Sequence, residues 1–496
     1  MLATSACRLN VHATNPAYLG SSDAMFRKKF KYLVATFIVS NLSVIQTLSA
    51  HDDDKPHSHA VRAVKPAEMY QPTPIPDRII LTWAGDPKTT QAVTWRTSIE
   101  VTDGYAELAI AGGGPDFAVL SETVHATSTA LKTDINTAHF HSVQFKGLKP
   151  GTKYAYRVGD KTNWSEWFHF STEKDSAEPF SFIYFGDAQN NLRSMWSRVI
   201  REAHSDAPKA KFIIHAGDLI NSAQSDGEWG EWFGAGAWLN AMIPSVPSVG
   251  NHEMQKSEGG KSRLSHHWRP QFTLPQDCPE GLEETCYTLQ YQDTLIVSMN
   301  SNEKLEEQVA WLDNVLGKNK QRWVVLNFHH PIFSTAKDRD NEKLRNLWKP
   351  ILDKYRVDLV LQGHDHTYGR TGLDTPVAIP NTIGNVPTGV KNVDTFTGTV
   401  YVVSVSGPKM YNLSPNTIMK RVAEDTQLYQ VIRIDGDKLY YESRTAIGDL
   451  YDGFVLEKQP GKPNRMTEVT PAVPERRRAE KEPKAEVSAA PAAIAK

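Results

Sequence analysis

Short apolar runs rich in Val, Ile and Phe recur in the middle of this chain, and each is too short for a helix and fits a buried strand. They cover residues 181–185, 212–215, 245–249, 323–328 and 357–361, and further strand-like runs follow at 399–404, 428–434 and 438–443. Residues 304–316 and 341–355 instead place apolar side chains at helical spacing. Strands that alternate with helices over residues 179–455 predict a layered α/β domain.

The region before residue 179 has a different pattern, in which short runs alternate apolar and polar positions between turn residues. These runs cover residues 79–83, 91–96, 105–110, 139–145, 153–158 and 164–172. Regularly spaced short strands predict a small β-sandwich over residues 75–175. The turn and strand at 148–154 are of the kind seen in fibronectin type III modules, and we interpret the aromatic residues as core rather than as a carbohydrate site.

The two ends of the chain carry patterns that do not predict a core. A basic segment at 26–31, an apolar stretch at 32–45 and a small-residue end at Ser49-Ala50 are typical of an export signal. We therefore expect residues 1–50 to be a leader and signal peptide, with Met25 as the alternative start, and the protein to be secreted or periplasmic. A retained anchor is disfavoured because the stretch is shorter than the roughly 20 residues of a span, so no stable membrane span is expected after cleavage.

Composition predicts a disordered linker rich in His and Asp over residues 51–74 and a disordered tail over residues 460–496. Of three cysteines, Cys7 lies in the leader, and Cys278 and Cys286 are eight positions apart. In an exported protein such a pair is expected to form a disulfide, with two free buried thiols as the alternative.

The charge balance serves only to disfavour some classes of partner. The chain of 496 residues has 55 basic and 57 acidic residues and a formal net charge of −2, so no polybasic surface is required and nucleic acid is not expected as a main partner. There is no Gly-x-Ser-x-Gly elbow, Walker loop or dinucleotide fingerprint. These absences disfavour a serine hydrolase and a nucleotide-cofactor enzyme.

The strand-like runs of the α/β region end at motifs made of metal-binding side chains. The motifs are Gly-Asp at 186–187, Gly-Asp at 217–218, Gly-Asn-His-Glu at 250–253, His-His-Pro at 329–331 and Gly-His-Asp-His at 363–366. Open α/β sheets bind ligands at the carboxyl ends of their strands, where these motifs would meet. Carboxylate, amide and imidazole ligands suit two metal ions about 3.5 to 4 Å apart that clamp a phosphoryl group. Asp218, which follows a glycine, is the candidate for a bridging carboxylate.

In order, spacing and identity the five motifs resemble those of the metallophosphoesterase superfamily, in particular its purple acid phosphatase-like branch, where a fibronectin-like domain precedes the catalytic domain. The resemblance covers residues 75 to 455 and implies a four-layer α/β sandwich for the catalytic domain. It places Asp187, Asp218 and His366 on one metal. It places Asp218, Asn251, His329 and His364 on a second.

The resemblance also implies catalytic roles. His252, which follows the ligand Asn251, would contact the phosphate or the leaving group as a general acid. His330 either contacts the substrate or packs behind the ligands. Arg339 is a candidate phosphate clamp, with a solvated surface arginine as the alternative.

The chain departs from the purple enzymes at one position, since their Gly-Asp-x-x-Tyr motif has Asn221 here in place of the tyrosine. Other members of the superfamily have Asp-x-His in the first motif, where this chain has Gln189. We therefore expect no purple chromophore. Gln189 or Asn221 would offer an amide oxygen, and two metal ions drawn from Mn, Zn and Fe(II) fit better than a ferric centre.

The sequence thus predicts an exported, metal-dependent hydrolase of small phosphate esters, most simply acid-phosphatase-like monoester hydrolysis by a hydroxide bound to two metals. The same site in a phosphodiesterase or nucleotidase is one alternative. A surface binding module with a non-catalytic metal site is another, and a homodimer stays open.

Overall fold

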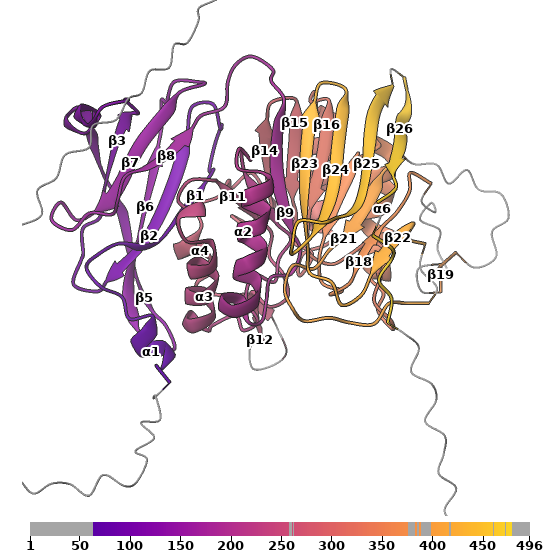
Figure 1. The fold of residues 1–496 in the computed structure, drawn as a ribbon, viewed down its shortest axis with the longest axis horizontal. Helices are drawn as coiled ribbons and strands as arrows, with labels where there is room; N and C mark the ends of the chain where they lie inside the picture. The colour runs from indigo at the N-terminus through magenta and orange to yellow at the C-terminus, as the bar shows by residue number, and fades with distance from the viewer. Residues whose placement is uncertain are drawn as a thin grey trace, which may run out of the picture. The chain divides into compact units, whose positions relative to one another are not determined.

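The computed structural model describes residues 63–256, 260, 262–374, 382–383, 386–387, 398–415, 418–459, 461–471 and 473–478. The predicted signal peptide, the start at Met25 and residues 51–62 of the predicted linker lie outside this part of the chain. Figure 1 shows the described elements, which form an N-terminal β-sandwich and an α/β domain.

The β-sandwich consists of two four-stranded antiparallel sheets. One sheet has the order β1 (Asp77–Thr82), β2 (Gln91–Ser98), β6 (Thr137–Phe145) and β5 (Thr127–Lys132); the other has β4 (Glu122–His125), β3 (Tyr105–Ile110), β7 (Lys153–Gly159) and β8 (Phe168–Ser171). Between them pack aromatic residues such as Trp95, Phe145 and Tyr156. The expected sandwich is confirmed, and the aromatic residues form its core.

The α/β domain contains two seven-stranded mixed sheets. The first has the order β11 (Ser245–Pro247), β10 (Ile213–His215), β9 (Phe180–Phe185), β23 (Leu428–Asp435), β24 (Lys438–Thr445), β25 (Leu450–Gln459) and β26 (Lys462–Val469). The second has β14 (Tyr287–Tyr291), β15 (Thr294–Ser298), β16 (Trp323–Asn327), β17 (Leu359–Gln362), β21 (Val400–Val403), β18 (Tyr368–Arg370) and β22 (Arg421–Ala423). In Figure 1 the C-terminal strands β23 to β26 continue the sheet that contains β9.

The longer helices of the α/β domain cover the outer faces of its two sheets. The longer ones are α2 (Ser197–Asp206), α3 (Asp226–Gly236), α5 (Glu307–Lys318) and α6 (Glu342–Tyr355), and the short ones are α1 (Pro66–Met69), α4 (Trp268–Gln271), η1 (Pro115–Leu120), η2 (Leu192–Trp196) and η3 (Ala237–Leu239). Two small two-stranded sheets complete the list: β12 (Met254–Lys256) with β13 (Ser262–Leu264), and β19 (Thr382–Ile383) with β20 (Val386–Pro387).

Alternating strand residues produce the layers. In β16, Val325 faces the core between the two sheets, whereas Leu326 packs with Leu312 of α5 and Trp348 of α6. On the other side, Val199 of α2 and Trp229 of α3 join the core that contains β9 and β10. The order helix, sheet, sheet, helix confirms the predicted four-layer α/β domain. Because both faces of these strands are buried, they read as continuous apolar runs in the sequence.

A buried charge cluster joins the sandwich to the α/β domain. The guanidinium of Arg78 in β1 donates to Asp226 Oδ1 at 2.6 Å, and that of Arg96 in β2 donates to Asp226 Oδ2 at 3.3 Å. Asp226 begins α3, and all three side chains are buried. Removing one partner would leave a buried charge unpaired, so the cluster ties the two domains together.

Three sequence expectations need correction. The linker was expected to be disordered to residue 74, but α1 lies within it, and the backbone carbonyl of Thr73 accepts a hydrogen bond from Ser98 N at 2.8 Å. The tail was expected to begin at 460, but β26 pairs with β25 along its length. Composition misses such an edge strand because backbone hydrogen bonds rather than apolar side chains hold it. Cys278 and Cys286 are free thiols and form no disulfide.

None of the helices in the described part of the chain is both long enough and apolar enough to span a bilayer.

Candidate metal centre

The strand ends bring the motif residues together as the sequence predicts. Strands β9, β10 and β11 are parallel neighbours in the first sheet, and β16 and β17 are parallel neighbours in the second. Asp187 and Asp218 follow β9 and β10 directly and are buried, with 0% and 1% of their surface exposed. Two carboxylates without solvent would repel each other, so they need cations beside them.

One group of candidate ligands consists of Asp187, Asp218 and His366, whose ligand atoms lie within 4.8 Å of one another. His366 Nδ1 donates to the carbonyl of Lys409 at 2.8 Å, which leaves Nε2 with a lone pair at 3.1 Å from Asp187 Oδ2. That carboxylate oxygen is buried and has no hydrogen-bond partner in the described structure. An unsatisfied buried carboxylate oxygen beside an imidazole lone pair is what a metal ion would satisfy.

The second group gathers around His329. Its Nδ1 donates to the carbonyl of Ala216 at 2.8 Å, so Nε2 faces the site. This atom lies 3.1 Å from Asn251 Oδ1, 3.1 Å from His364 Nδ1 and 3.3 Å from Asp218 Oδ2. Four polar atoms from four separate strand ends thus converge, and Asp218 belongs to both groups. A shared carboxylate between two ligand sets is the arrangement expected for a bridged metal pair.

The protonation of these groups fits a site built for cations. Burial alone would raise the pKa of Asp218, but His329 and the backbone N–H of His252 lower it to about 2. Burial alone would lower the pKa of His329, but Asp218 and Asp187 raise it to about 9. Burial and the charge of His329 lower the pKa of His364, so its ring is neutral. The positive charge of protonated His329 therefore balances the negative charges of Asp218 and Asp187. A bound metal ion would take over that role and displace the proton.

The backbone at the centre is close-packed and strained. A Cβ on Gly363 would lie 2.1 Å from Asp187 Oδ1, and a Cβ on Gly250 would lie 2.2 Å from Asp218 Oδ1, so both motifs require glycine. Asp218, His364 and His366 have φ values of 51°, 76° and 49°. Left-handed backbone is costly for residues with a side chain and concentrates at functional sites.

Glu253, the last residue of the Gly-Asn-His-Glu motif, had no role in the sequence prediction. Its buried carboxylate accepts hydrogen bonds from the backbone N–H groups of Asp218 at 2.9 Å, Leu219 at 2.8 Å and Gly250 at 2.8 Å. It therefore fixes the loops that carry Asp218 and Asn251 relative to each other. The signal available in the sequence was its place in the same motif as the candidate ligand Asn251.

Gln189 and Asn221 lie near the centre, but their amides have other partners. Gln189 Nε2 donates to Asp218 Oδ2 at 2.7 Å, and its Oε1 accepts from Lys409 Nζ at 3.1 Å. The amide of Asn221 donates to Ser222 Oγ at 3.3 Å, whereas its backbone carbonyl contacts His252 Nδ1. The oxygen of Gln189 that we expected to face a metal is thus engaged by an ammonium group. Ligation by either amide stays a prediction.

The three predicted catalytic residues also surround the centre. His252 is anchored through Nδ1, and its Nε2 lies 3.9 Å from Asp218 Oδ2. His330 Nδ1 contacts Ser301 Oγ at 2.8 Å, and burial together with His329 lowers the pKa of His330 to about 3. A neutral His330 forms a cluster of candidate ligands with His329 and His364, closer to the metal position than the sequence implied.

Arg339 NH1 donates to the carbonyl of His364 at 2.9 Å and lies 3.7 Å from Asp365 Oδ1. Its guanidinium also packs over the ring of Tyr411, at 4.7 Å from the centroid. These contacts hold the Gly-His-Asp-His loop, so the arginine has a structural role besides the phosphate contact that stays a prediction.

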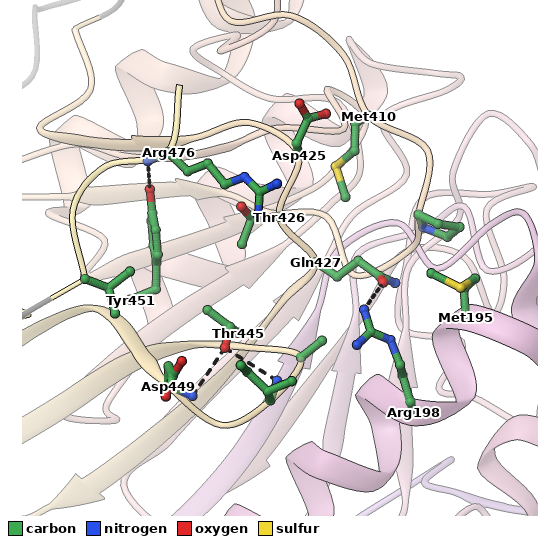
Figure 2. Close-up of a pocket in the computed structure, with 14 residues that line it drawn as sticks. Met195, Arg198, Met410, Asp425, Thr426, Gln427, Thr445, Asp449, Tyr451 and Arg476 are labelled. Atoms are coloured by element: carbon green, nitrogen blue, oxygen red, sulfur yellow. Dashed lines mark hydrogen bonds between the residues drawn. The ribbon is translucent and has the colours of Figure 1, made fainter. Parts of the chain in front are cut away.

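A cavity of about 560 Å³ lies beside this centre and contains none of the predicted ligands. Figure 2 shows it between Met195 and Arg198 on one side and Thr445, Asp449 and Tyr451 on the other. Neither Asp187 nor Asp218 lines this cavity, so it is distinct from the candidate metal centre at the strand ends.

Two parts of the chain match known families. Residues 76–172 match the family described as Purple acid Phosphatase, N-terminal domain, and residues 180–368 match Calcineurin-like phosphoesterase. The chain belongs to the metallophosphoesterase superfamily, in its purple acid phosphatase-like branch. This confirms the resemblance that the five motifs carry, and it makes the protein a phosphoesterase of the hydrolase class.

Relatives of this metallophosphoesterase are distant. An uncharacterized protein of Mycobacterium tuberculosis is 26% identical over 365 residues, covering 64% of this chain and 67% of the relative. Acid phosphatase type 7 of Mus musculus is 26% identical over 340 residues, covering 62% and 73%. A purple acid phosphatase from yellow lupin (Lupinus luteus) seeds has a TM-score of 0.62 at 20% identity, covering 77% of this chain and 74% of that one. At this identity the solved structure shows the fold alone.

The family uses a dinuclear metal site, and the ligand geometry fits one. Buried carboxylates, neutral or proton-sharing imidazoles and an amide oxygen form a mixed oxygen and nitrogen donor set, which borderline divalent ions accept. The residues that would hold the metals are Asp187, Asp218, Asn251, His329, His364 and His366, with His330 adjacent.

Proposed function

We propose that this protein hydrolyses phosphomonoesters in the manner of an acid phosphatase, using two divalent ions such as Mn, Zn or Fe(II), and that it is exported. The observation that carries the proposal is the convergence on His329 Nε2 of Asn251, His364 and Asp218 within 3.3 Å, with Asp218 belonging also to the group of Asp187 and His366. Two ions bound there would supply Lewis-acid stabilisation of phosphoryl charge and activate a water.

The chain's own residues would orient the ester and move a proton. The contact from His252 Nδ1 to the carbonyl of Asn221 directs Nε2 toward the centre. With 27% of its side chain exposed, His252 lies at the border between the buried ligands and solvent. It is therefore placed to donate a proton from Nε2 to the oxygen of the leaving group.

In this proposal, none of the described side chains at the centre acts as the nucleophile. Asp187 and Asp218 belong to one candidate ligand group with His366, and Asp218 also accepts from the backbone N–H of His252 at 2.9 Å. Carboxylates held in this way bind cations rather than attack phosphorus, so direct attack by water is the simpler reaction.

The test is hydrolysis of para-nitrophenyl phosphate and of bis-para-nitrophenyl phosphate by metal-reconstituted protein, beside the His329→Ala and Asp218→Asn variants, with bound metal counted in each. We expect monoester turnover with about two metals in the wild type and a loss of at least about 100-fold in both variants. Preference for the bis-ester would replace the proposal with a phosphodiesterase. Two bound metals with no turnover of either ester would favour a binding module.

A further inference from the structure

The segment that follows β21, residues 404–410, forms backbone hydrogen bonds with candidate ligands of the metal centre. Ser406 N and Gly407 N both donate to the carbonyl of Asp187, at 3.0 and 2.7 Å, and the carbonyl of Lys409 accepts from His366 Nδ1 at 2.8 Å. The backbone just before Lys409 and the carbonyl of Lys409 itself are thus bonded to two candidate ligands of the same metal. A residue held in this way has a fixed position relative to that metal.

The side chain of Lys409 points to the ligands. Its ammonium donates to Gln189 Oε1 at 3.1 Å, and Gln189 in turn donates to Asp218 Oδ2 at 2.7 Å. The neighbours Pro408 and Met410 line the separate cavity, where Figure 2 labels Met410, whereas Lys409 does not. Successive side chains of residues 408–410 therefore point in different directions, and the ammonium of Lys409 points toward the metal centre.

The ammonium of Lys409 has hydrogen-bond donors that are not used by the described residues. Among the described residues, Gln189 Oε1 is the hydrogen-bond acceptor of this ammonium, which also lies over the ring of Tyr411 at 5.5 Å from the centroid and has no carboxylate oxygen within 4.0 Å. An ammonium group has three donors, so two are free to meet an anion. Lys409 is half-buried. In such surroundings, a cation with no carboxylate partner attracts an anion more strongly than it would in water.

We propose that Lys409 contacts the phosphoryl group of the substrate beside the metal bound by Asp187 and His366, and that it selects dianionic phosphomonoesters over diesters. This inference rests on the proposed function. A phosphomonoester offers three terminal oxygens and two negative charges, whereas a diester offers two oxygens and one charge. An additional fixed cation therefore stabilises the bound monoester more.

The experiment compares Lys409→Gln, Lys409→Arg and Lys337→Gln with the wild type, all metal-reconstituted. Lys337 is exposed on a neighbouring loop, so its variant controls for the loss of one positive charge near this face. For each protein, kcat/KM is measured on para-nitrophenyl phosphate and on bis-para-nitrophenyl phosphate. Affinity for inorganic phosphate is measured by calorimetry, and bound metal is counted.

Lys409→Gln is expected to keep its metals, to lower kcat/KM for the monoester about 10- to 100-fold, to change the diester less than about threefold and to bind phosphate about tenfold more weakly. Lys409→Arg should recover part of the monoester rate, and Lys337→Gln should match the wild type. Parallel loss on both esters would overturn the proposal in favour of a loop-positioning role. Unchanged phosphate affinity would overturn it as well.

The two proposals can fail separately. If the wild type turned over monoesters and Lys409→Gln did so equally well, the role of Lys409 would be wrong and the phosphatase would stand. If the wild type hydrolysed neither ester, the phosphatase would be wrong. The calorimetry would then still decide whether the ammonium binds phosphate.

Discussion

His141 in the β-sandwich and His329 at the metal centre are both fully buried, but their ring nitrogens meet different partners. His141 contacts Ser128 Oγ through Nδ1 and Thr97 Oγ1 through Nε2, both at 2.7 Å, and stacks on Trp95. His329 donates through Nδ1 to a carbonyl, while Nε2 faces a carboxylate, an amide and a second imidazole. Burial alone therefore does not mark a ligand. The convergence of acceptor atoms on one nitrogen does.

The pKa values follow from this difference. Burial lowers the pKa of His141 to about 4, because its hydroxyl partners carry no charge that would compensate. For His329 the two aspartates outweigh burial and raise the pKa to about 9. The sandwich excludes a cation at its histidine, whereas the metal centre requires one.

The largest effect should come from His329→Gln. Its ring is the point where the ligand atoms meet, so we expect loss of metal and a decrease in kcat/KM for para-nitrophenyl phosphate of at least about 100-fold. Metal analysis and kinetics measure both. The metal-free variant should unfold at a lower denaturant concentration than metal-free wild type, because it lacks the protonated ring that offsets Asp187 and Asp218. Retention of two metals with wild-type turnover would contradict the assignment of this residue.

Glu253→Gln should have the next largest effect, about 10- to 100-fold in kcat/KM with weaker metal binding. The amide would present an N–H group to backbone donors that now bind a carboxylate, and the Asp218 and Gly250 loops would move apart. Glu228→Gln is a matched control, since Glu228 accepts from the backbone N–H groups of Asn221 and Ser222 and not from those of Asp218, Leu219 and Gly250 that Glu253 binds. Equal losses in the two variants would argue against a specific positioning role for Glu253.

The sequence predicted the strands that precede each motif because a buried parallel strand is a continuous apolar run, as in β16. It missed α3, which contains four glycines and is begun by Ser225, whose side chain accepts from Glu228 N at 3.3 Å. It missed β26, an edge strand in which Asn464 is the one buried residue. Helices and strands of this kind depend on contacts that local pattern does not encode.

At the centre the sequence predicted which side chains gather at the strand ends, because glycine beside Asp or His at a strand end is a local pattern. Their role as metal ligands stays a prediction. The sequence did not predict Lys409, whose partner Gln189 is 220 positions away. It left open whether Gln189 or Asn221 offers an amide oxygen to a metal, since an amide side chain in isolation does not show which groups will approach its oxygen. Residues that act through long-range contacts become visible only when the fold is known.

A third prediction concerns acid stability. Unfolded histidine has a pKa near 6.5, whereas folded His141 has a pKa of about 4. Between these values the unfolded chain binds a proton that the folded sandwich does not, so stability decreases as the pH falls from about 6.5 to 4, by about 2 kcal/mol after allowance for solvent screening. Urea unfolding of metal-free protein at several pH values measures this. His141→Gln should remove this contribution to the slope and leave kcat/KM unchanged at neutral pH.

The smallest effect should come from Ser128→Ala in the sandwich. The variant removes one of the two hydroxyl partners of His141 and leaves Nδ1 without the contact at 2.7 Å. Loss of one partly buried hydrogen bond should lower the free energy of unfolding by about 1 kcal/mol, with no change in metal content or in ester turnover. Chemical denaturation beside metal analysis measures the separation. A change in metal content would show that the sandwich and the metal centre are coupled, and that the contrast between their histidines does not reflect two independent sites.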